Sequence, residues 1–305
     1  MKRRFATAAA AAVALLLGAC SDEGHDGGVA TGSTLHTHTQ ATSLGKPDRP
    51  IAGPQGTQAQ FLVECLYSHA AMDDPIVFPG QPGQSHLHVF FGNTDVDAFT
   101  TTADLVGGET TCDQRQDTAA YWAPALMRNG MNLTPIKSTA YYRPGLDVDP
   151  TTVQPYPVGL VMVAGDAGAV AEQPVEIVAW TCGAGIERAV TPPTCSEDRA
   201  LRLLVTFPDC WDGVNLDSPD HHAHVAYSSG GLCPEGYPVP VPQLQFGVEY
   251  PVHGDPTGLV LASGGLLTGH ADFMNGWDQA KLESEIALCL HRDLVCGITS
   301  GRKTG

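Results

Sequence analysis

The chain has 305 residues, of which 33 are Asp or Glu and 16 are Lys or Arg, so its formal net charge is −17. Nucleic acids and anionic membrane surfaces attract basic proteins, so this acidic balance disfavours both as partners. We therefore expect no nucleic-acid partner and no contact with a membrane through a basic patch.

The first residues have the pattern of an export signal. A basic start at residues 2–4 precedes an apolar run over residues 6–17, which is too short to span a bilayer. The run ends in LGAC at residues 17–20, which resembles the bacterial lipobox, where the cysteine is acylated. We predict a lipoprotein signal peptide over residues 1–19, lipidation of Cys20, and an extracytoplasmic protein that is lipid-anchored to the bacterial cell membrane.

The remaining chain divides by composition into a tether and a domain. Residues 20–56 are rich in Gly, Thr, Ser, Asp and Pro and have few large apolar side chains, which predicts a flexible tether. Residues 57–300 contain short apolar runs, separated by turn residues, that are typical of strands. These runs are residues 59–67, 86–92, 121–127, 158–165, 175–180, 201–207, 245–250 and 258–263. The pattern predicts a mainly β, sandwich-like single domain with long loops.

One segment near the C-terminus has helical spacing instead. Leu282, Ile286, Cys289 and Leu290 recur at intervals of three and four residues, which predicts one apolar helix face. Asp278 precedes this segment and is a suitable N-cap, so we expect one C-terminal helix.

The cysteines agree with export. Nine are present, and lipidation of Cys20 leaves eight, an even number that predicts four disulfides in an oxidising compartment. No Cys-x-x-Cys motif occurs, which disfavours a zinc ribbon and a thioredoxin-like redox site. The pairing stays open, although short separations favour Cys182–Cys195, Cys210–Cys233 and Cys289–Cys296.

The first of three histidine motifs is SHLHVFF, starting at Ser85. On a strand, His86, His88 and Phe90 share one face, because side chains alternate between faces. Two imidazoles side by side suit a metal ion. The alternative is a pair of histidines that form hydrogen bonds at the end of a strand.

The second motif is SPDHHAHVAY, starting at Ser218. His222 and His224 share a face if the segment is extended, whereas His221 and His224 approach one another only if the backbone turns. Asp220 is a candidate ligand or a partner that orients an imidazole. The alternative is a polar turn.

The third motif is GHADFMNGWD, starting at Gly269. His270 and Asp272 again have one-sided spacing, and Asn275-Gly276 signals a turn before Trp277. Asp272 is a candidate metal ligand, a candidate general base, or a partner that orients a ligand. The alternative is a loop held by side-chain to backbone hydrogen bonds.

Together the motifs favour one His/Asp pocket. In an oxidising compartment without free thiols, imidazole and carboxylate groups suit zinc or copper. The candidate metal ligands are His86, His88, His221, His224, His270 and Asp272, and the candidate catalytic groups are His221, His224 and Asp272.

Aromatic and acidic residues beside the motifs suggest a place for a sugar ring. The candidate ligand-binding residues are Trp211, Asp212, Asp220, Asn275 and Trp277. Filling of the core by the aromatic residues is the commoner alternative. The acidic segment at residues 208–220 also leaves open an irregular calcium site or a glycosidase-like carboxylate pair.

These motifs carry a resemblance to a family. SHLHVFFGN, AYWAPAL, YYRPG, FPDCWDGVNLDSPDHHAHVAY, PVPVPQL and DFMNGWD together resemble the secreted DUF1996 family, a domain of unknown function found mostly in fungi and also in bacteria. The family pattern carries over to His86, His88, Asp209, Cys210, Trp211, Asp212, Gly213, Asp217, His221, His224, Asp272, Asn275, Gly276 and Trp277. His222 is extra to the pattern, so the resemblance favours a turned backbone that presents His221 and His224.

The resemblance implies little chemistry, but some fungal relatives carry wall-sugar-binding modules. We therefore expect an activity, metal-dependent or assisted by a His/Asp pair, on extracellular or cell-wall polysaccharide. The alternative is a non-catalytic envelope module that binds carbohydrate or metal.

Overall fold

The computed structural model describes residues 52–53, 56–184 and 187–296, all of which belong to one compact unit, Leu35–Gly305. The predicted signal peptide, Cys20 and most of the predicted tether lie outside the described residues, as do residues 297–300 of the predicted domain.

Strands dominate the described part of the chain, as the sequence predicts. The main sheet contains β3 (Phe61–Ala71), β4 (His88–Gly92), β5 (Ala120–Pro124), β8 (Lys137–Arg143), β9 (Val161–Gly165), β10 (Val178–Cys182), β11 (Leu201–Thr206), β15 (Gln243–Tyr250) and β17 (His270–Met274). Shorter strands are β1 (Ala52–Gly53), β2 (Gly56–Thr57), β6 (Leu126–Arg128), β7 (Met131–Asn132), β12 (Cys210–Trp211), β13 (Val225–Ala226), β14 (Val239–Pro240) and β16 (Leu259–Leu261). The helical elements are α1 (Thr102–Leu105), a 3-10 turn (Pro150–Thr152), α2 (Gln279–Glu285) and a π-helical turn (Ile286–Leu290).

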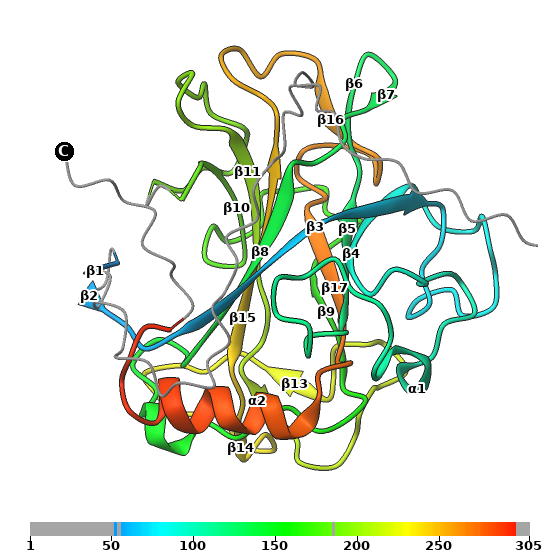
Figure 1. Ribbon diagram of the computed structural model, residues 1–305. Helices are drawn as coiled ribbons and strands as arrows, with labels where there is room; N and C mark the ends of the chain where they lie inside the picture. The colour runs from blue at the N-terminus through cyan, green and yellow to red at the C-terminus, as the bar shows by residue number, and fades with distance from the viewer. Residues whose placement is uncertain (1–51, 54–55, 185–186, 297–305) are drawn as a thin grey trace, which may run out of the picture. The chain divides into compact units, whose positions relative to one another are not determined.

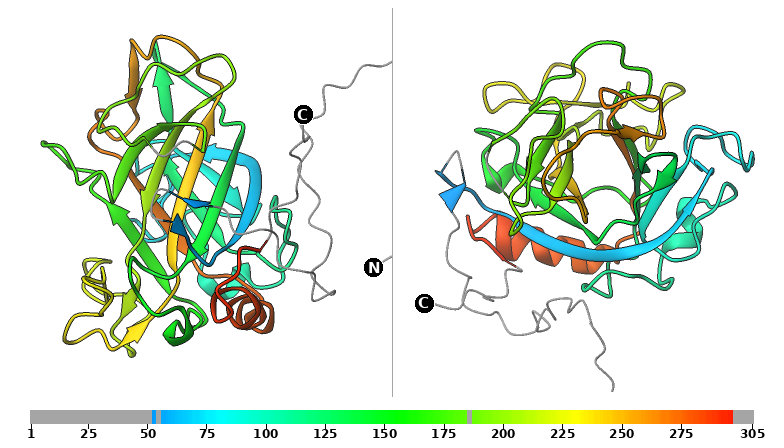
Figure 2. Two further views of the ribbon diagram at one scale, coloured as in Figure 1. Left: turned by 90° about the vertical axis from the view of Figure 1, so that its left-hand side faces the viewer. Right: turned by 90° about the horizontal axis from the view of Figure 1, so that it is seen from above.

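The main sheet is antiparallel and curls until it almost closes into a barrel. Its order is β10-β11-β15-β8-β3-β4-β5-β17-β9. The curvature is plain in the view from above in Figure 2, and Figure 1 shows the strands from the side. The sheet therefore has an inner face, where side chains from its different strands pack together, and an outer face, which is covered by loops.

The long strand β3 carries the sheet around its bend. Its first half pairs with β8 and its second half pairs with β4. The register with β4 shifts between Tyr67 and Ala70, and such an irregularity bends and twists a strand. One strand therefore belongs to both halves of the curved sheet, as the long blue arrow in Figures 1 and 2 shows.

The two edges of the sheet approach each other at glycines. A Cβ atom on Gly269 would lie 2.6 Å from Cγ1 of Val178 in β10. A Cβ atom on Gly165 would lie 3.1 Å from Cγ2 of the same valine. Gly165 also has φ 82°, a conformation that favours glycine. Glycine is therefore required at position 269 for packing, because the absence of a side chain lets β10 come close to the start of β17.

Alternation along the strands separates two hydrophobic clusters. Val89 and Phe91 of β4 belong to the large core inside the curved sheet, whereas Phe90 points outward into a second cluster. Trp122 of β5 and Val163 of β9 join Phe90 in that outer cluster. The outer face of β4, β5, β17 and β9 is therefore buried as well, beneath loops, and the histidines of β4 and β17 lie on it.

The predicted C-terminal helix is confirmed. Its N-cap is Asp278, whose carboxylate accepts a hydrogen bond from the backbone N of Lys281 at 2.8 Å. Leu282, Ile286 and Leu290 bury their side chains in the main core. Within the described ranges, no helix is long and apolar enough to cross a membrane.

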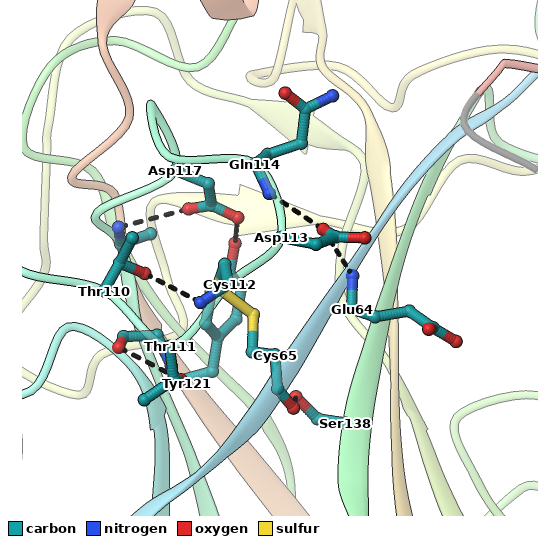
Figure 3. The surroundings of a disulfide bond; sticks show 12 residues. Glu64, Cys65, Thr110, Thr111, Cys112, Asp113, Gln114, Asp117, Tyr121 and Ser138 are labelled. Atoms are coloured by element: carbon teal, nitrogen blue, oxygen red, sulfur yellow. Dashed lines mark hydrogen bonds between the residues drawn. A yellow bond between two sulfur atoms is a disulfide. The ribbon is translucent and has the colours of Figure 1, made fainter. Parts of the chain in front are cut away.

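Four disulfides join the eight cysteines of the described domain. Cys182–Cys195, Cys210–Cys233 and Cys289–Cys296 confirm the predicted short-range pairs, and the last bridge is Cys65–Cys112. This last bridge fastens a loop to β3, and Asp113 holds the same loop by accepting hydrogen bonds from the backbone N of Glu64 and Gln114, as Figure 3 shows. Four disulfides point to an extracytoplasmic protein.

Candidate metal centre

Three histidines meet on the buried outer face of the sheet, two of them at the first residues of strands and one just before a strand. His88 begins β4 and His270 begins β17, with β5 between them, and His86 lies two residues before His88. The Nε2 atom of His270 lies 3.1 Å from Nε2 of His86 and 3.5 Å from Nε2 of His88. Nitrogens that share one zinc ion have this spacing, because each lies about 2.0–2.1 Å from the ion.

Backbone carbonyls fix the tautomers of the two buried rings. Nδ1 of His88 lies 2.9 Å from the carbonyl oxygen of Asp73, and Nδ1 of His270 lies 2.8 Å from that of Thr268. A carbonyl oxygen only accepts hydrogen bonds, so each Nδ1 carries the proton. In the neutral rings both Nε2 atoms then present lone pairs to one another, an arrangement that suits a shared cation and not a hydrogen bond.

Burial keeps these imidazoles neutral. It lowers the pKa of His88 well below its ordinary value, and the neighbouring His86 and His270 lower that pKa further. Burial also lowers the pKa of His270 to about 4, and it lowers the pKa of the partly exposed His86. Neutral imidazole is the form that binds a metal, so no proton has to leave at pH 7.

A buried carboxyl pair lies beside the histidines. Asp272, two residues after His270 on the same face, has both oxygens buried without a hydrogen-bond partner in the described structure. Asp74 accepts hydrogen bonds from the backbone N of Ile76 at 3.1 Å and of Val77 at 2.9 Å. Donor atoms of Asp74, His88 and Asp272 all lie within 4.8 Å of one another.

Burial raises the pKa of both carboxyl groups. For Asp272 it raises the pKa well above the ordinary value, and the charge of Asp74 raises it further. For Asp74 burial also dominates, although the amides of Val77 and Ile76 and the charge of His221 lower its pKa. A nearby cation would stabilise the charged form of these groups, which otherwise costs free energy to bury.

The donor set fits zinc or copper. Three imidazole nitrogens form one donor group, and a second group joins His88 to the carboxylates of Asp74 and Asp272. The described cysteines are all in disulfides, so no thiolate competes. A second group of donors, Cys65, Cys112 and Asp117, is unsuitable because its two sulfurs form a disulfide. Of the predicted ligand set, the structure therefore brings together His86, His88 and His270, and it places Asp272 beside His88.

The second motif does not join the three histidines. The backbone turns at His221, whose φ is 59°, and Asp220 stabilises the turn by accepting hydrogen bonds from the backbone N of His222 and Ala223. Nδ1 of His221 lies 2.9 Å from a carboxylate oxygen of Asp217. Its interaction with Asp74 is electrostatic, and it lowers the pKa of that carboxyl group. The extended pairing of His222 with His224 is therefore wrong, and the turned backbone is correct.

His224 is bonded elsewhere on the same outer face. Its Nε2 donates to the carbonyl oxygen of Val161 at 2.8 Å, and its Nδ1 lies 2.9 Å from the hydroxyl of Ser218. Val161 pairs with Met274, the opposite end of β17 from His270. Because both ring nitrogens are engaged, His224 fastens its loop to β9 and has no nitrogen left for a metal.

The predicted sugar-binding residues form other contacts within the described structure. Trp277 is buried in the main core, where its Nε1 donates to the hydroxyl of Tyr142, and the side-chain amide of Asn275 donates to the carbonyl oxygen of Pro157. Trp211 donates from Nε1 to the carbonyl of Asn215. Asp212 and Asp220 accept hydrogen bonds from amides of their own turns. These contacts stabilise loops and the core, and Trp277, at 2% exposure, is part of the core.

Asp74 is the residue that sequence reasoning missed. It lies in DDP at residues 73–75, a turn signal with two adjacent carboxylates directly after the long strand β3. Its neighbour Asp73 supplies the carbonyl that orients His88. An acidic pair that precedes proline could have been noted, but only the folded chain shows that it faces the histidine motif.

The fold and the centre together define a disulfide-bonded, mainly β domain with a buried cluster of histidines and carboxyl groups on one face of its sheet. The family model named Domain of unknown function (DUF1996) matches residues 74–277. The chain therefore belongs to this family. Comparisons with curated proteins and with solved structures gave no match.

Proposed function

We propose that the protein is a lipid-anchored, extracytoplasmic metalloprotein that acts on extracellular or cell-wall polysaccharide through the His86/His88/His270 centre. The observation that carries the proposal is the approach of the Nε2 atoms of His86 and His88 to that of His270. Backbone carbonyls fix the tautomers of His88 and His270.

The residues have distinct roles in this proposal. His88 and His270 form the rigid, buried part of the centre, and the partly exposed His86 marks its open side. Bound zinc supplies a water whose pKa is lowered to near neutrality. Asp272, held beside His88 with both oxygens unpartnered, is the group that accepts a proton or completes the ligand set.

The polysaccharide part of the proposal has a different basis. It follows from the family resemblance, because some fungal relatives carry wall-sugar-binding modules, and from the predicted export signal and Cys20 anchor. A chain exported and anchored in this way would meet envelope polysaccharide, which supports this class of substrate.

A non-catalytic metal- or carbohydrate-binding module is the second candidate. The exposed fractions of His88, His270 and Asp272 are 0%, 3% and 1%. Three histidines and one carboxylate complete a tetrahedral zinc site, and such closed sites are usually structural. A site of this kind would stabilise the domain without activating water.

Metal analysis with a matched control tests the centre. We expect about one equivalent of zinc or copper in the purified chain by elemental analysis. The His86→Ala/His88→Ala variant should lose it, whereas His222→Ala, which removes an exposed histidine of the second motif, should keep it. Equal metal content in the wild type and the double variant would contradict the centre.

Product release then separates the two candidates. The metal-loaded chain is incubated with a panel of wall and extracellular polysaccharides, and reducing ends and released oligosaccharides are measured. Release that the double variant lacks supports the enzyme. Metal binding with no release from any polymer supports the binding module.

A further inference from the structure

We propose that a second site, a cleft on the outer face of β8, β11 and β15, binds a sugar that carries a carboxylate, such as a uronic acid residue. The cleft has a volume of about 350 Å³. Its lining residues are Gln58, Arg143, Leu146, Pro174, Glu176, Ile177, Arg188, Thr206, Tyr227, Ser228, Gln243 and Gln245. The histidine centre lies on other strands, β4 and β17, so the two sites use separate parts of the sheet.

Two arginines supply the positive charge of the cleft. Arg143 ends β8 and donates from Nη2 to the side-chain oxygen of Gln245 at 2.8 Å, while its buried Nε has no hydrogen-bond partner in the described structure. Arg188 donates from Nη1 to the backbone carbonyls of Val175 and Glu176. Within the described ranges neither guanidinium forms an ion pair with a carboxylate. Burial lowers the pKa of Arg188, and the charge of Glu176 only partly opposes this.

A third arginine adds to the positive charge nearby. The guanidinium carbons of Arg143 and Arg202 lie 5.4 and 5.1 Å from the centre of the Tyr141 ring. Arg202 is buried, and its Nε and Nη2 have no hydrogen-bond partner in the described residues. Burial lowers the pKa of Arg143 to about 10, and the charges of Arg188 and Arg202 lower it further, whereas the Tyr141 ring opposes this.

This cluster is unusual in so acidic a chain. Acidic residues outnumber basic ones by 33 to 16, so a carboxylate partner for a buried guanidinium is readily supplied. Buried charges are normally paired, and the planar guanidinium edge matches a carboxylate with two parallel hydrogen bonds. Arg143 and Arg188 both line the cleft and neither has a carboxylate partner within the described ranges, so an anionic ligand in the cleft would complete their pairing.

The rest of the lining indicates a ligand with hydroxyl groups. The lining also includes Gln58, Gln243 and Gln245, whose side-chain amides both donate and accept, and Ser228, which has a hydroxyl group. The side chain of Ile177 is one of the apolar groups that can lie against ring carbons. Mixed amide, hydroxyl and apolar walls around a guanidinium suit an acidic sugar better than a bare inorganic anion.

Calorimetric titration of the full mature chain tests the site. The probes are galacturonate and trigalacturonate, with galactose as the neutral control and inorganic phosphate as the simple anion. We expect the uronates to bind, and their affinity to fall as salt is raised, because the contact is between charges. Galactose should bind at least tenfold more weakly.

Variants assign the binding to the cleft. Arg143→Gln and Arg188→Gln should each weaken trigalacturonate binding at least tenfold, and Arg199→Gln, which removes an exposed arginine, should leave it unchanged. Arg143→Lys keeps the charge without the planar edge and should also weaken binding. If Arg143→Gln does not fold, Arg188→Gln decides, because its side chain is only partly buried.

The outcomes separate this site from the metal centre. The His86→Ala/His88→Ala variant should bind trigalacturonate as the wild type does. No uronate binding, binding unchanged in both arginine variants, or equal affinity for galactose would overturn the inference. Phosphate binding as tight as that of galacturonate would reject the acidic sugar as the ligand.

Discussion

At the scale of single residues, the carbonyls of Asp73 and Thr268 decide the chemistry of the histidine centre. Each accepts a hydrogen bond from the Nδ1–H of a buried imidazole, which leaves Nε2 free to act as a ligand. Neither carbonyl is visible as a signal in the sequence, since every residue has one. The type of side chain is therefore written in the sequence, whereas its tautomer depends on the local fold.

Asp272→Asn tests the carboxylate of this centre. We expect zinc affinity to fall about 10- to 100-fold, because the variant removes a negative charge beside the metal. The metal-free variant should be no less stable than the metal-free wild type at pH 7, because burial without hydrogen bonds already penalises the charged carboxylate. Chelator competition measures the affinity, and thermal unfolding in chelator measures the stability.

The control is Glu172→Gln, which removes an exposed carboxylate. It should change neither quantity. Unchanged zinc affinity in Asp272→Asn would show that the carboxylate makes no contribution to metal binding.

Asp117 gives the domain a pH-dependent stability. It is fully buried and accepts hydrogen bonds from the hydroxyl of Tyr121 at 2.6 Å and from the backbone N of Ala119 at 3.1 Å (Figure 3). Burial raises its pKa from 3.8 to about 8, despite these two hydrogen bonds. The folded protein therefore holds a proton that the unfolded chain releases at lower pH.

The sign of the effect follows from this difference. Below pH 4 both states are protonated, and the contribution of Asp117 is fully present. Between pH 4 and pH 8 the unfolded chain loses the proton first, so stability falls by at most about 1.4 kcal/mol per pH unit. Above pH 8 no further loss is expected from this group.

Asp117→Asn should remove that slope, because an amide mimics the protonated carboxyl. Urea titrations measure the unfolding free energy of both proteins. As pH rises from 4 to 8, the unfolding free energy of the wild type should fall relative to that of the variant. Glu235→Gln, at an exposed position, should show no such trend. Parallel pH profiles for the wild type and Asp117→Asn would contradict the raised pKa.

At the scale of elements, strands with one polar face were the difficult ones to predict. β8 has the sequence KSTAYYR, in which Lys137, Thr139, Tyr141 and Arg143 share the outer face. The inward Ala140 and Tyr142 alternate with these polar residues, so the sequence of β8 contains no continuous apolar run that would predict a strand. β17 was missed as a strand for a related reason, because His270 and Asp272 interrupt its apolar residues.

The helix was easier, because its cap and stripe are local signals. Asp278→Ala should lower the unfolding free energy by about 1 kcal/mol, since the backbone N of Lys281 loses its side-chain acceptor. Denaturant titration measures the loss. Glu283→Ala, an exposed change within α2, is the control and should cost less than half as much. Equal losses would show that the cap is unimportant.

At the scale of the whole molecule, disulfides fasten the loops to the curved sheet. Alkylation of the folded chain under non-reducing conditions should label none of the eight domain cysteines in an intact-mass measurement. Reduction should lower stability by about 2–5 kcal/mol per bridge, because it frees the unfolded chain. Labelling of two or more thiols in the native chain is the result that the four-bridge structure does not allow.

The anchor belongs to the same scale. The chain expressed in a bacterium should partition into the detergent phase, because acylation of Cys20 adds a lipid. Cys20→Ser should release the protein or block its processing, whereas Ser21→Ala, the neighbouring change, should leave partitioning intact. Wild-type protein found only in the aqueous phase would refute lipidation.

The sequence alone was enough for features that depend on near neighbours. Three disulfides close short loops, the helix begins at its cap, and alternation puts His86 with His88, and His270 with Asp272, on single faces. These signals depend on residues two to four positions apart or on short separations along the chain. They can therefore be predicted without knowledge of the tertiary structure.

Only the tertiary structure decided which of these pieces meet. His86 and His270 are 184 residues apart and come together because β5 pairs with both β4 and β17. The same strand order brings in Asp74 and leaves His224 at the other end of β17. Alternation sets the face of a side chain, but strand order and register set its neighbours, and these depend on how the whole sheet packs.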